Sequence, residues 1–361
     1  MLAPGITIIG GGPAGATAGW LLSRKQFKVH LLEKEEFPRD KICGCCLNES
    51  ALQIIRDGKT DKYPVDIPPF FPQKELVLHY KKRNIKIPLP GGIILSRIDL
   101  DRFLLERAIE AGCKVKYNTK VNIPENIEKL SLPDDLSLET SIICIASGLD
   151  PRHSTPNSKK LGLGAKWLRP DSSYPKEAGR VNMWLSNEGY LGETLLPDGS
   201  IAYAAAINRK YLKSIAESNT NQSGSTGYLL SRLFCLPHLE ELKWKGTPLL
   251  KTAAPSTGKG TCIRIGDAAG YIEPFTGQGM AWAINSGKMA SDLIETHFKD
   301  HKMNDLGHQW NSVLNKKMSY SRKVCSVVSG IASKPDFCFS LLSLPFSSYI
   351  SKNLINFIYR N

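Results

Sequence analysis

A glycine-rich turn near the start of the chain constrains the fold more than any other feature of the sequence. The β-rich segment "ITIIG" (6–10) runs into Gly10-Gly11-Gly12-Pro13-Ala14-Gly15. Pro13 suits the first turn of a helix, which "ATAGWLLSRK" (16–25) continues, and "KVHLLEK" (28–34) returns as a second strand. Strand, turn, helix and strand in this order predict a βαβ unit with parallel strands.

The glycines of this turn have the spacing of a dinucleotide-binding motif. Gly10 permits the tight turn, Gly12 lets the backbone approach a pyrophosphate, and Gly15 allows helix and strand to pack closely. The helix N-terminus offers its free N–H groups to the phosphates. Glu33, 18 residues past Gly15, can accept hydrogen bonds from ribose hydroxyls, which favours FAD or NAD over NADP.

A second glycine-rich motif lies in "IRIGDAAGYIEPFTGQGMAWAINSG" (263–287). Its strand ends at Gly266-Asp267, where a carboxylate can bind the hydroxyls of a polyol chain. Pro274, Gly277 and Gly279 then lead into a helix whose N-terminal dipole would stabilise negative charge on a reduced isoalloxazine ring. The two motifs together predict that distant parts of the chain hold one flavin dinucleotide.

The chain changes character after the apolar run "SIICIAS" (141–147). The segments "RVNMWLS", "GYLGETLLP" and "SIAYAAAIN" read as strands at hairpin spacing, which predicts an antiparallel sheet. The expected fold class is α/β, with a Rossmann-like FAD-binding domain on a parallel sheet and an antiparallel-sheet substrate domain. We predict an FAD-binding domain of residues 1–66, 96–150 and 251–300, a substrate-binding domain of residues 67–95 and 151–250, and a C-terminal helical segment, 301–361.

Shorter patterns predict individual elements. Asn48 can cap a helix through "ESALQIIRD" (49–57), and "KELVLHYKKRNIKIPLP" (74–90) reads as two strands about a turn at Arg83-Asn84. Asp99 is expected to open the helix "LDRFLLERAIEAG" (100–112). Its apolar stripe comprises Leu100, Phe103, Leu104, Ala108 and Ile109.

Four segments together resemble the geranylgeranyl reductase type of FAD-dependent oxidoreductase, within the p-hydroxybenzoate hydroxylase-like flavoproteins: "GGGPAG", "FPRDKICG", "LSRIDLDRFLLERAIEAG" and the second glycine motif. The resemblance is close over roughly residues 6–150 and 255–295, and elsewhere covers strand rhythm and "GYLGETLLPDGS". It implies flavin contacts near Arg39, Lys41 and Arg97. The cofactor-binding residues that we expect are Gly10, Gly12, Pro13, Ala14, Gly15, Glu33, Lys34, Arg39, Lys41, Cys43, Gly44, Arg97, Ser147, Gly148, Gly266, Asp267, Gly277, Gln278, Gly279 and Met280.

The chain departs from such proteins at Ala146-Ser147-Gly148, where they usually carry Ala-Asp-Gly. A serine cannot supply the negative charge of the aspartate. The sequence therefore leaves open whether this site helps to hold the flavin or its nicotinamide donor.

Three thiols crowd into "ICGCC" (42–46). Cys43 and Cys46 have the gap of a zinc knuckle and could be completed by His297 and His301, or they could form a redox dithiol. The two pairs lie about 250 residues apart and no second cysteine pair exists, so we predict no metal site. Cys45 and Cys46 are expected to serve packing.

The resemblance implies a further alternative for Cys43. In reductases of this type a Cys-Gly at this position lies beside the flavin at the substrate cavity, so Cys43 would be a catalytic thiol that positions or protonates the substrate. Gly44 would give room against the ring. A small apolar residue that merely lines the pocket remains the other interpretation of Cys43.

The expected activity follows from the flavin. No second glycine fingerprint follows the first, so NAD(P)H would bind transiently over the flavin face. We predict reduction of a carbon–carbon double bond in an apolar small molecule held near Cys43, Trp184 and Tyr190. For the two aromatic residues, a place in the core is the other interpretation. The alternatives are a flavin monooxygenase that hydroxylates an aromatic, polyketide or peptide substrate, and a non-catalytic flavin-binding sensor. The absence of a "GWxWxIP" segment argues against a flavin halogenase.

Charge and apolar runs bear on partners and location. The chain has 47 Lys and Arg against 34 Asp and Glu, but no basic helix, so we expect no nucleic-acid partner. The apolar run 337–350 is too short to span a bilayer, whereas the amphipathic tail 348–360 could lie on an anionic membrane. The nine scattered cysteines fit a reducing compartment, so the expected location is cytoplasmic, with peripheral membrane contact as an addition. The oligomeric state stays open.

Overall fold

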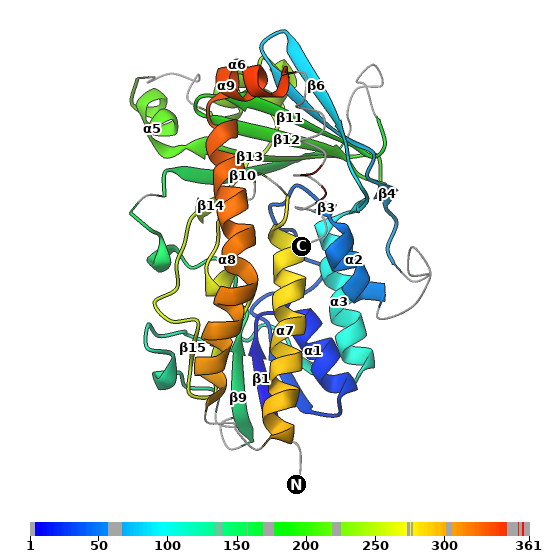
Figure 1. Ribbon diagram of the computed structural model, residues 1–361, viewed down its shortest axis with the longest axis vertical. Helices are drawn as coiled ribbons and strands as arrows, with labels where there is room; N and C mark the ends of the chain where they lie inside the picture. Colours follow the sequence, from blue (N-terminus) through cyan, green and yellow to red (C-terminus); the bar gives the residue numbers. More distant parts are fainter. Residues whose placement is uncertain are drawn as a thin grey trace.

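The structure is a computed structural model with two tiers, and one long helix runs along both of them (Figure 1). It describes residues 4–56, 67–133, 136, 139–156, 158–168, 177–218, 225–272, 275, 277–300, 305–344, 353 and 356. Parallel strands build the lower tier of Figure 1 and mainly antiparallel strands build the upper tier. The predicted α/β class, with a Rossmann-like domain and an antiparallel sheet, is confirmed.

The lower tier contains a six-stranded sheet of order β15-β16-β9-β1-β2-β8. Its strands are β1 (Gly5–Ile9), β2 (Lys28–Leu32), β8 (Lys114–Lys116), β9 (Thr140–Ile145), β15 (Gly258–Lys259) and β16 (Cys262–Arg264). The pairings are parallel except that of β15 with β16. Ile145 of β9 is in register with both Ile9 and Arg264, so the carboxyl ends of β1, β9 and β16 meet at one edge of the sheet. This is the edge at which open parallel sheets bind ligands.

Helices cover one face of this sheet, with α1 between α3 and α7 (Figure 1). They are α1 (Pro13–Arg24), α2 (Glu49–Arg56), α3 (Arg97–Glu110) and α7 (Gly279–Lys299). The contact between α1 and α7 requires a glycine, because a Cβ on Gly287 would lie 2.5 Å from the carbonyl oxygen of Ala14. Asn48 caps α2 as predicted, since its Oδ1 accepts a hydrogen bond from the backbone N–H of Ala51 at 3.1 Å.

The helix predicted from Asp99 begins earlier, at Arg97. The reason is the cap: Ser96 is extended, and its Oγ accepts a hydrogen bond from the N–H of Ile98 at 3.2 Å. The predicted apolar stripe was wrong at Ile109, which is 45% exposed, whereas Leu105 is buried. The helix therefore buries a face rotated toward Leu105.

The upper tier is a seven-stranded sheet of order β14-β10-β13-β12-β11-β5-β6. Its strands are β5 (Glu75–Tyr80), β6 (Arg83–Pro88), β10 (Lys160–Trp167), β11 (Arg180–Ser186), β12 (Gly189–Leu195), β13 (Ile201–Asn208) and β14 (Lys245–Leu249). The predicted antiparallel run over β11, β12 and β13 is confirmed, although β11 pairs with β5 in parallel. The turn predicted at Arg83-Asn84 is instead formed by Lys81 and Lys82, because Tyr80 pairs with Arg83 and Lys81 takes a left-handed φ of 54°.

The two faces of the upper sheet have different partners. One face packs on α5 (Arg209–Ser218), α6 (Thr226–Phe234) and a short 3-10 helix (Pro237–Glu241). The other face looks toward the lower tier. A small sheet of β3 (Cys46–Leu47), β7 (Ile93–Ile94) and β4 (Phe71–Pro72) connects the tiers, and further 3-10 turns lie at Ile127–Lys129, Pro151–His153 and Gly266–Ala269.

The C-terminal helices join the tiers from outside. α8 (Leu306–Ala332) has 27 residues, which gives a length of about 40 Å, and α9 (Pro335–Leu342) follows it across the upper sheet. At the lower end, Trp310 Nε1 donates a hydrogen bond to the carbonyl oxygen of Arg264 at 2.8 Å. Among the residues that the structure describes, none of the helices has the length and apolar character needed to cross a bilayer. Of the tail 348–360, only Asn353 and Asn356 are described, so its membrane contact stays a prediction.

Candidate flavin and substrate site

The loop between β1 and α1 accepts only glycine at two positions. Gly10 has a φ of +108°, and a Cβ there would lie 2.4 Å from the carbonyl oxygen of Ala146 on β9. A Cβ on Gly15 would lie 1.9 Å from the carbonyl oxygen of Gly10. Gly12 is the N-cap of α1 and no side chain caps that end. The first N–H groups of α1 therefore lack a side-chain partner, which fits a pyrophosphate at this end of the helix.

Glu33 lies at the end of β2, directly beside this loop. Its carboxylate is buried and accepts hydrogen bonds from the N–H of Gly11 at 2.6 Å and of Glu35 at 3.1 Å. A carboxylate has about four acceptor positions, so about two remain for ribose hydroxyls. The neighbouring Lys34 is exposed and pairs with Glu35 at 3.4 Å, outside the site.

A buried chain of alternating charges leads from Glu33 toward the centre of the molecule. Arg39 Nη2 lies 3.6 Å from Glu33 Oε2 and 3.8 Å from Asp101 Oδ2. Arg97 then donates from Nε and Nη2 to the two carboxylate oxygens of Asp101, at 2.8 and 2.9 Å. The Nε of Arg39 is buried without a hydrogen-bond partner among the described residues. Arg39 and Arg97 thus stand in one network, and an acceptor beside Arg39 would satisfy its free N–H.

Sequence reasoning missed Asp101, which joins the two arginines. The side chain is completely buried. Burial lowers the pKa of Arg97, but the charge of Asp101 outweighs this effect and raises the pKa above its ordinary value. The spacing of four residues between Arg97 and Asp101 on one helix could have revealed the pair.

Cys43 sits where this charge chain ends. The N–H of Cys45 donates to Cys43 Sγ at 3.3 Å. Hydrogen bonding from Cys45 and the positive charge of Arg97 lower the pKa of Cys43 to about 6, although burial opposes them. Burial raises the pKa of Cys46 to about 12. At neutral pH Cys43 is thus largely a thiolate, which can give a proton only after it has taken one up.

The second motif brings Asp267 to the same place from the other end of the chain. Gly266 has a φ of +61°, and its N–H donates to Ser286 Oγ of α7 at 2.8 Å, which ties the loop to that helix. Burial raises the pKa of Asp267 to about 6, although the charge of Arg97 opposes this. α7 begins at Gly279 without a side-chain cap, so its first N–H groups are also available to an acceptor.

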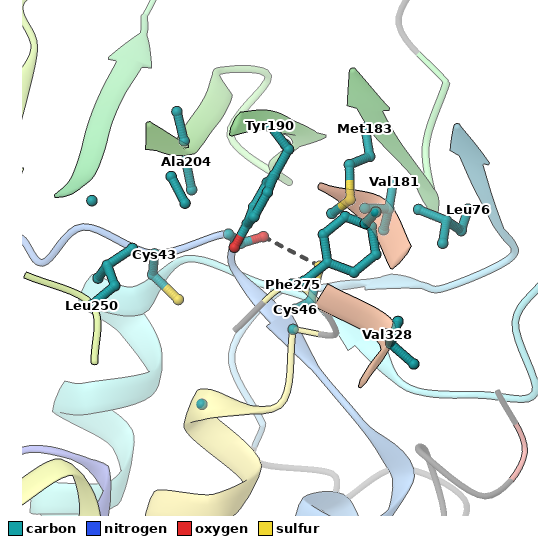
Figure 2. Close-up of a pocket in the computed structure, with 18 of the residues that line it drawn as sticks. Cys43, Cys46, Leu76, Val181, Met183, Tyr190, Ala204, Leu250, Phe275 and Val328 are labelled. Carbon is teal, nitrogen blue, oxygen red and sulfur yellow. Dashed lines mark hydrogen bonds between the residues drawn. The ribbon is translucent and has the colours of Figure 1, made fainter. Parts of the chain in front are cut away.

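One cavity of about 700 Å³ joins these groups to the upper sheet. At its lower end it is lined by Pro13, Cys43, Gly44, Arg97, Asp267, Gly277, Gly279 and Met280. The far wall is apolar and includes Leu76, Val181, Met183, Tyr190, Ala204, Leu250, Phe275 and Val328. Figure 2 shows the side chains of Val181, Met183 and Tyr190 extending from the sheet above Cys43, with Phe275 between them and Cys46. The rings of Tyr190 and Phe275 meet edge to face, with centroids 5.0 Å apart.

Comparison with known proteins gives this arrangement a family context. A family model described as an NAD(P)-binding Rossmann-like domain matches residues 8–71. Geranylgeranyl diphosphate reductase of Rhodobacter capsulatus is 24% identical over 322 residues, which cover 83% of this chain and 77% of that protein. The chain is thus similar in sequence to this reductase over most of its length. The predicted resemblance is therefore confirmed.

Other relatives carry other names. Conditioned medium factor receptor 1 of Dictyostelium discoideum is 27% identical over 345 residues, 84% of this chain but only 65% of that protein, so the chain spans less than two thirds of it. Menaquinone reductase of Mycobacterium tuberculosis is 22% identical over 338 residues, 86% of this chain and 79% of that protein.

Solved structures share the fold of this protein over almost its whole length. A flavin-dependent brominase has a TM-score of 0.76 at 17% identity and covers 99% of this chain and 94% of its own. A geranylgeranyl bacteriochlorophyll reductase-like protein from Thermoplasma acidophilum has a TM-score of 0.68 at 17% identity and covers 100% and 92%. These likenesses confirm the predicted fold, and the predicted class, an oxidoreductase, rests on the relatives that are named as reductases.

Trp184 packs on a core cluster, one of its two predicted places, and Cys46 both packs and lines the cavity. Trp184 does not line the cavity, because alternate residues of a strand face opposite sides: Met183 faces the cavity, and Trp184 stacks on His79 with ring centroids 4.7 Å apart. Cys46, expected to serve packing, lines the cavity beside Gly277. Tyr190 lines it as predicted.

Several expected cofactor residues lie beside the cavity rather than along it. Gln278 turns its side chain to α8, where Oε1 lies 3.2 Å from the donor Cys325 Sγ. Lys41 Nζ lies 3.7 Å from Glu35 Oε1, and Ser147 is exposed just after β9. Neither residue lines the cavity, and Gly148 does not line it either. Pro274 falls outside the described residues.

The zinc alternative fails on distance for His297, and His301 falls outside the described residues. Cys46 contacts the start of α7 at Gly277, whereas His297 lies near its far end, about 27 Å along the helix axis. His297 is buried, with Nδ1 3.0 Å from the carbonyl oxygen of Leu293. Within the part of the chain that the structure describes, no three His, Cys, Asp or Glu side chains gather as metal ligands would.

Proposed function

We propose that the protein uses bound FAD, reduced by NAD(P)H, to reduce a carbon–carbon double bond in a long apolar substrate, an isoprenoid lipid. The observation that carries the proposal is that one cavity is lined both by residues expected at the flavin and by the apolar face of the upper sheet. A flavin held there would supply hydride chemistry. The chain itself must hold the flavin, exclude water and provide the proton.

The residues present fit a flavin dinucleotide. The uncapped start of α1 and the glycine loop suit the pyrophosphate, and Glu33 keeps acceptor positions for the adenine ribose. Asp267 and the uncapped start of α7 lie at the lower end of the cavity, where they suit the polyol chain and the ring. These groups come from both ends of the sequence, so the cofactor would also hold the lower tier together.

The shape and chemistry of the cavity support a lipid substrate. Its volume of about 700 Å³ falls within the usual range of ligand sites. Aliphatic side chains and the Tyr190–Phe275 pair form most of the far wall, and such a wall buries methyl-branched chains without unsatisfied polar groups. Two of the relatives are named for the reduction of geranylgeranyl diphosphate and of menaquinone, both of which carry isoprene units.

Reduction of an alkene places a hydride on one carbon and a proton on the other. We assign the proton to Cys43, because it lines the cavity and Arg97 links it to the buried charge chain. Since the pKa of Cys43 is lowered to about 6, the protonated fraction falls as pH rises above 6. If Cys46 provided the proton instead, no such fall would occur near pH 6, because burial raises its pKa to about 12.

The test is anaerobic oxidation of the reduced holoenzyme by an alkene lipid. Geranylgeranyl diphosphate and a menaquinone serve as trial substrates, the absorbance of the flavin is followed, and products are weighed by mass spectrometry. Products heavier by two hydrogens, without oxygen, support the proposal. Oxygen uptake with an oxygenated product would indicate a monooxygenase, and failure of both NADH and NADPH to reduce the flavin would indicate a sensor.

A further inference from the structure

The C-terminal helix α9 carries an exposed apolar stripe. Phe337 is 56% exposed, Leu341 38% and Leu344, just past the helix, 55%. Their spacing of four and three residues places them on one side of a helix. The opposite side is buried against the upper sheet through Cys338 and Phe339. Single exposed apolar side chains are ordinary, but an exposed row indicates an interaction surface.

Cations surround this stripe. The turn between β5 and β6 brings Lys81 to Asp336 of α9 and Arg83 to Ser343 just after it, and Lys82 is exposed in the same turn. The Arg83 guanidinium lies 5.2 Å from the ring centroid of Phe339, and its Nη2 donates to Ser343 Oγ at 3.0 Å. Lys334, immediately before α9, is also exposed. We call the exposed set Lys81, Lys82, Arg83, Lys334, Phe337, Leu341 and Leu344 the α9 patch.

The one carboxylate within residues 81–88 and 334–344 is already neutralised. Asp336 Oδ2 accepts a hydrogen bond from Tyr80 OH at 2.8 Å, and its Oδ1 lies 3.2 Å from Lys81 Nζ. This pairing also fixes α9 to the end of β5. The patch therefore presents a net positive charge around an apolar row, which complements a surface with anionic groups over an apolar layer.

The substrate cavity reaches the surface at this patch. Leu341 and Leu344 line the cavity and are themselves exposed, so they form part of its mouth. Val328 and Ile331 of α8 line the cavity next to them. Figure 1 shows α9 and the β5–β6 hairpin together at the end of the molecule farthest from the N-terminus. Leu344 and Cys43 thus line the same, mainly apolar cavity.

We infer that the α9 patch docks on an anionic lipid bilayer, so that the lipid substrate passes from the bilayer into the cavity without crossing water. The inference rests on the proposed lipid substrate and assigns the surface through which it enters. Phe337, Leu341 and Leu344 insert among the acyl chains near the headgroups. Lys82, Arg83 and Lys334 contact anionic headgroups, whereas Lys81 is paired with Asp336. The occupant is the membrane because both its apolar layer and its charge match the patch around the cavity mouth.

Vesicle sedimentation of the FAD-loaded protein tests this inference. The vesicles contain phosphatidylcholine alone or with one third phosphatidylglycerol, at 0.1 M salt. We expect binding to the anionic vesicles and weak binding to the neutral ones. Lys82→Glu should weaken binding about 30-fold, since it changes two charges near the surface. Phe337→Ser should weaken it about tenfold or more through lost apolar insertion.

Matched variants elsewhere provide the controls. Ile109→Ser removes an exposed apolar side chain from α3, and Lys243→Glu makes the same charge change near β14, at the opposite edge of the upper sheet from β6. Both should bind anionic vesicles within about twofold of the unaltered protein. The visible flavin spectrum and circular dichroism establish that each variant is folded.

Three results would overturn the inference: no binding of the unaltered protein to anionic vesicles, equal binding to neutral ones, or equal losses in the control and patch variants. Self-association that Phe337→Ser abolishes, without vesicle binding, would assign the patch to a second copy of the chain. Alkene reduction measured with detergent-dissolved substrate separates this inference from the proposed function. Reduction in detergent without vesicle binding overturns the docking alone, whereas vesicle binding without reduction overturns the function alone.

Discussion

Burial of the ionised Asp267 carboxylate lowers the free energy of unfolding, and this effect can be measured. Burial raises its pKa from 3.8 to about 6. A raised carboxyl pKa means that the folded state holds the proton more tightly than the unfolded state, so the free energy of unfolding falls as pH rises from about 4 to about 6. A shift of two pKa units corresponds to about 3 kcal/mol, so the free energy of unfolding is lower by about this amount at pH 7 than it would be without the buried charge.

The substitution Asp267→Asn removes that charge and keeps the shape of the side chain. We expect FAD-free Asp267→Asn protein to be more stable than the unaltered protein by about 3 kcal/mol at pH 7 and by little at pH 4, where the folded carboxyl is already protonated. Urea unfolding at both pH values measures this. The same variant should bind FAD about tenfold more weakly or worse, because a charged hydrogen-bond acceptor is lost.

Asp150, a carboxylate whose pKa is lowered rather than raised, provides the control. Hydrogen bonding from Arg152 lowers the pKa of Asp150 to about 2, so Asp150→Asn should reduce stability at pH 7. The reasoning about Asp267 is refuted if Asp267→Asn gains nothing at pH 7, or gains as much at pH 4 as at pH 7.

Three further predictions concern the site. The rate at which iodoacetamide alkylates Cys43 should fall about tenfold from pH 7 to pH 5, because the thiolate fraction follows a pKa of about 6. Mass spectrometry measures the alkylation, and Cys43→Ser assigns it to this site. A midpoint near pH 9 would show that Cys45 and Arg97 do not stabilise the thiolate. Gly15→Ala should abolish retention of the yellow cofactor on purification, since its Cβ would lie 1.9 Å from the carbonyl oxygen of Gly10, and a variant that keeps FAD would contradict this steric argument. Ala204→Leu, which fills the cavity wall, should raise KM at least about tenfold for a twenty-carbon substrate and less for a ten-carbon one; equal changes for both lengths would mean that substrate does not reach this wall.

Local sequence patterns were sufficient for the dinucleotide-binding half of the molecule. The strand, the turn at Gly10–Gly15 and the helix obey short-range rules, and a Cβ at Gly15 would clash with Gly10 of the same unit. Asn48 likewise caps its helix through a contact only three residues away. Errors at this scale were shifts of a cap or a turn, as at Ser96 and at Lys81, where one side chain or one backbone dihedral decides the boundary.

The substrate end of the site escaped sequence reasoning because its walls come from many strands and helices. Whether Met183 or Trp184 faces the cavity depends on which face of β11 the sheet presents to the lower tier. The contribution of Val328 and Leu341 depends on the path of α8 and α9 back across the upper sheet. Neither relation has a signal in neighbouring residues.

The sequence by itself determined that a strand, a glycine turn and an acidic residue would form a dinucleotide site, because those groups act on each other over a few residues. Only the tertiary structure decided which thiol is ionised and where the cavity opens. The lowered pKa of Cys43 depends partly on Arg97, which is 54 positions away in the sequence. The cavity opens beside Leu344 because this residue lies near strands of the upper sheet that are far from it in the sequence. Electrostatic fields and shared walls depend on distance in space, which sequence separation does not record.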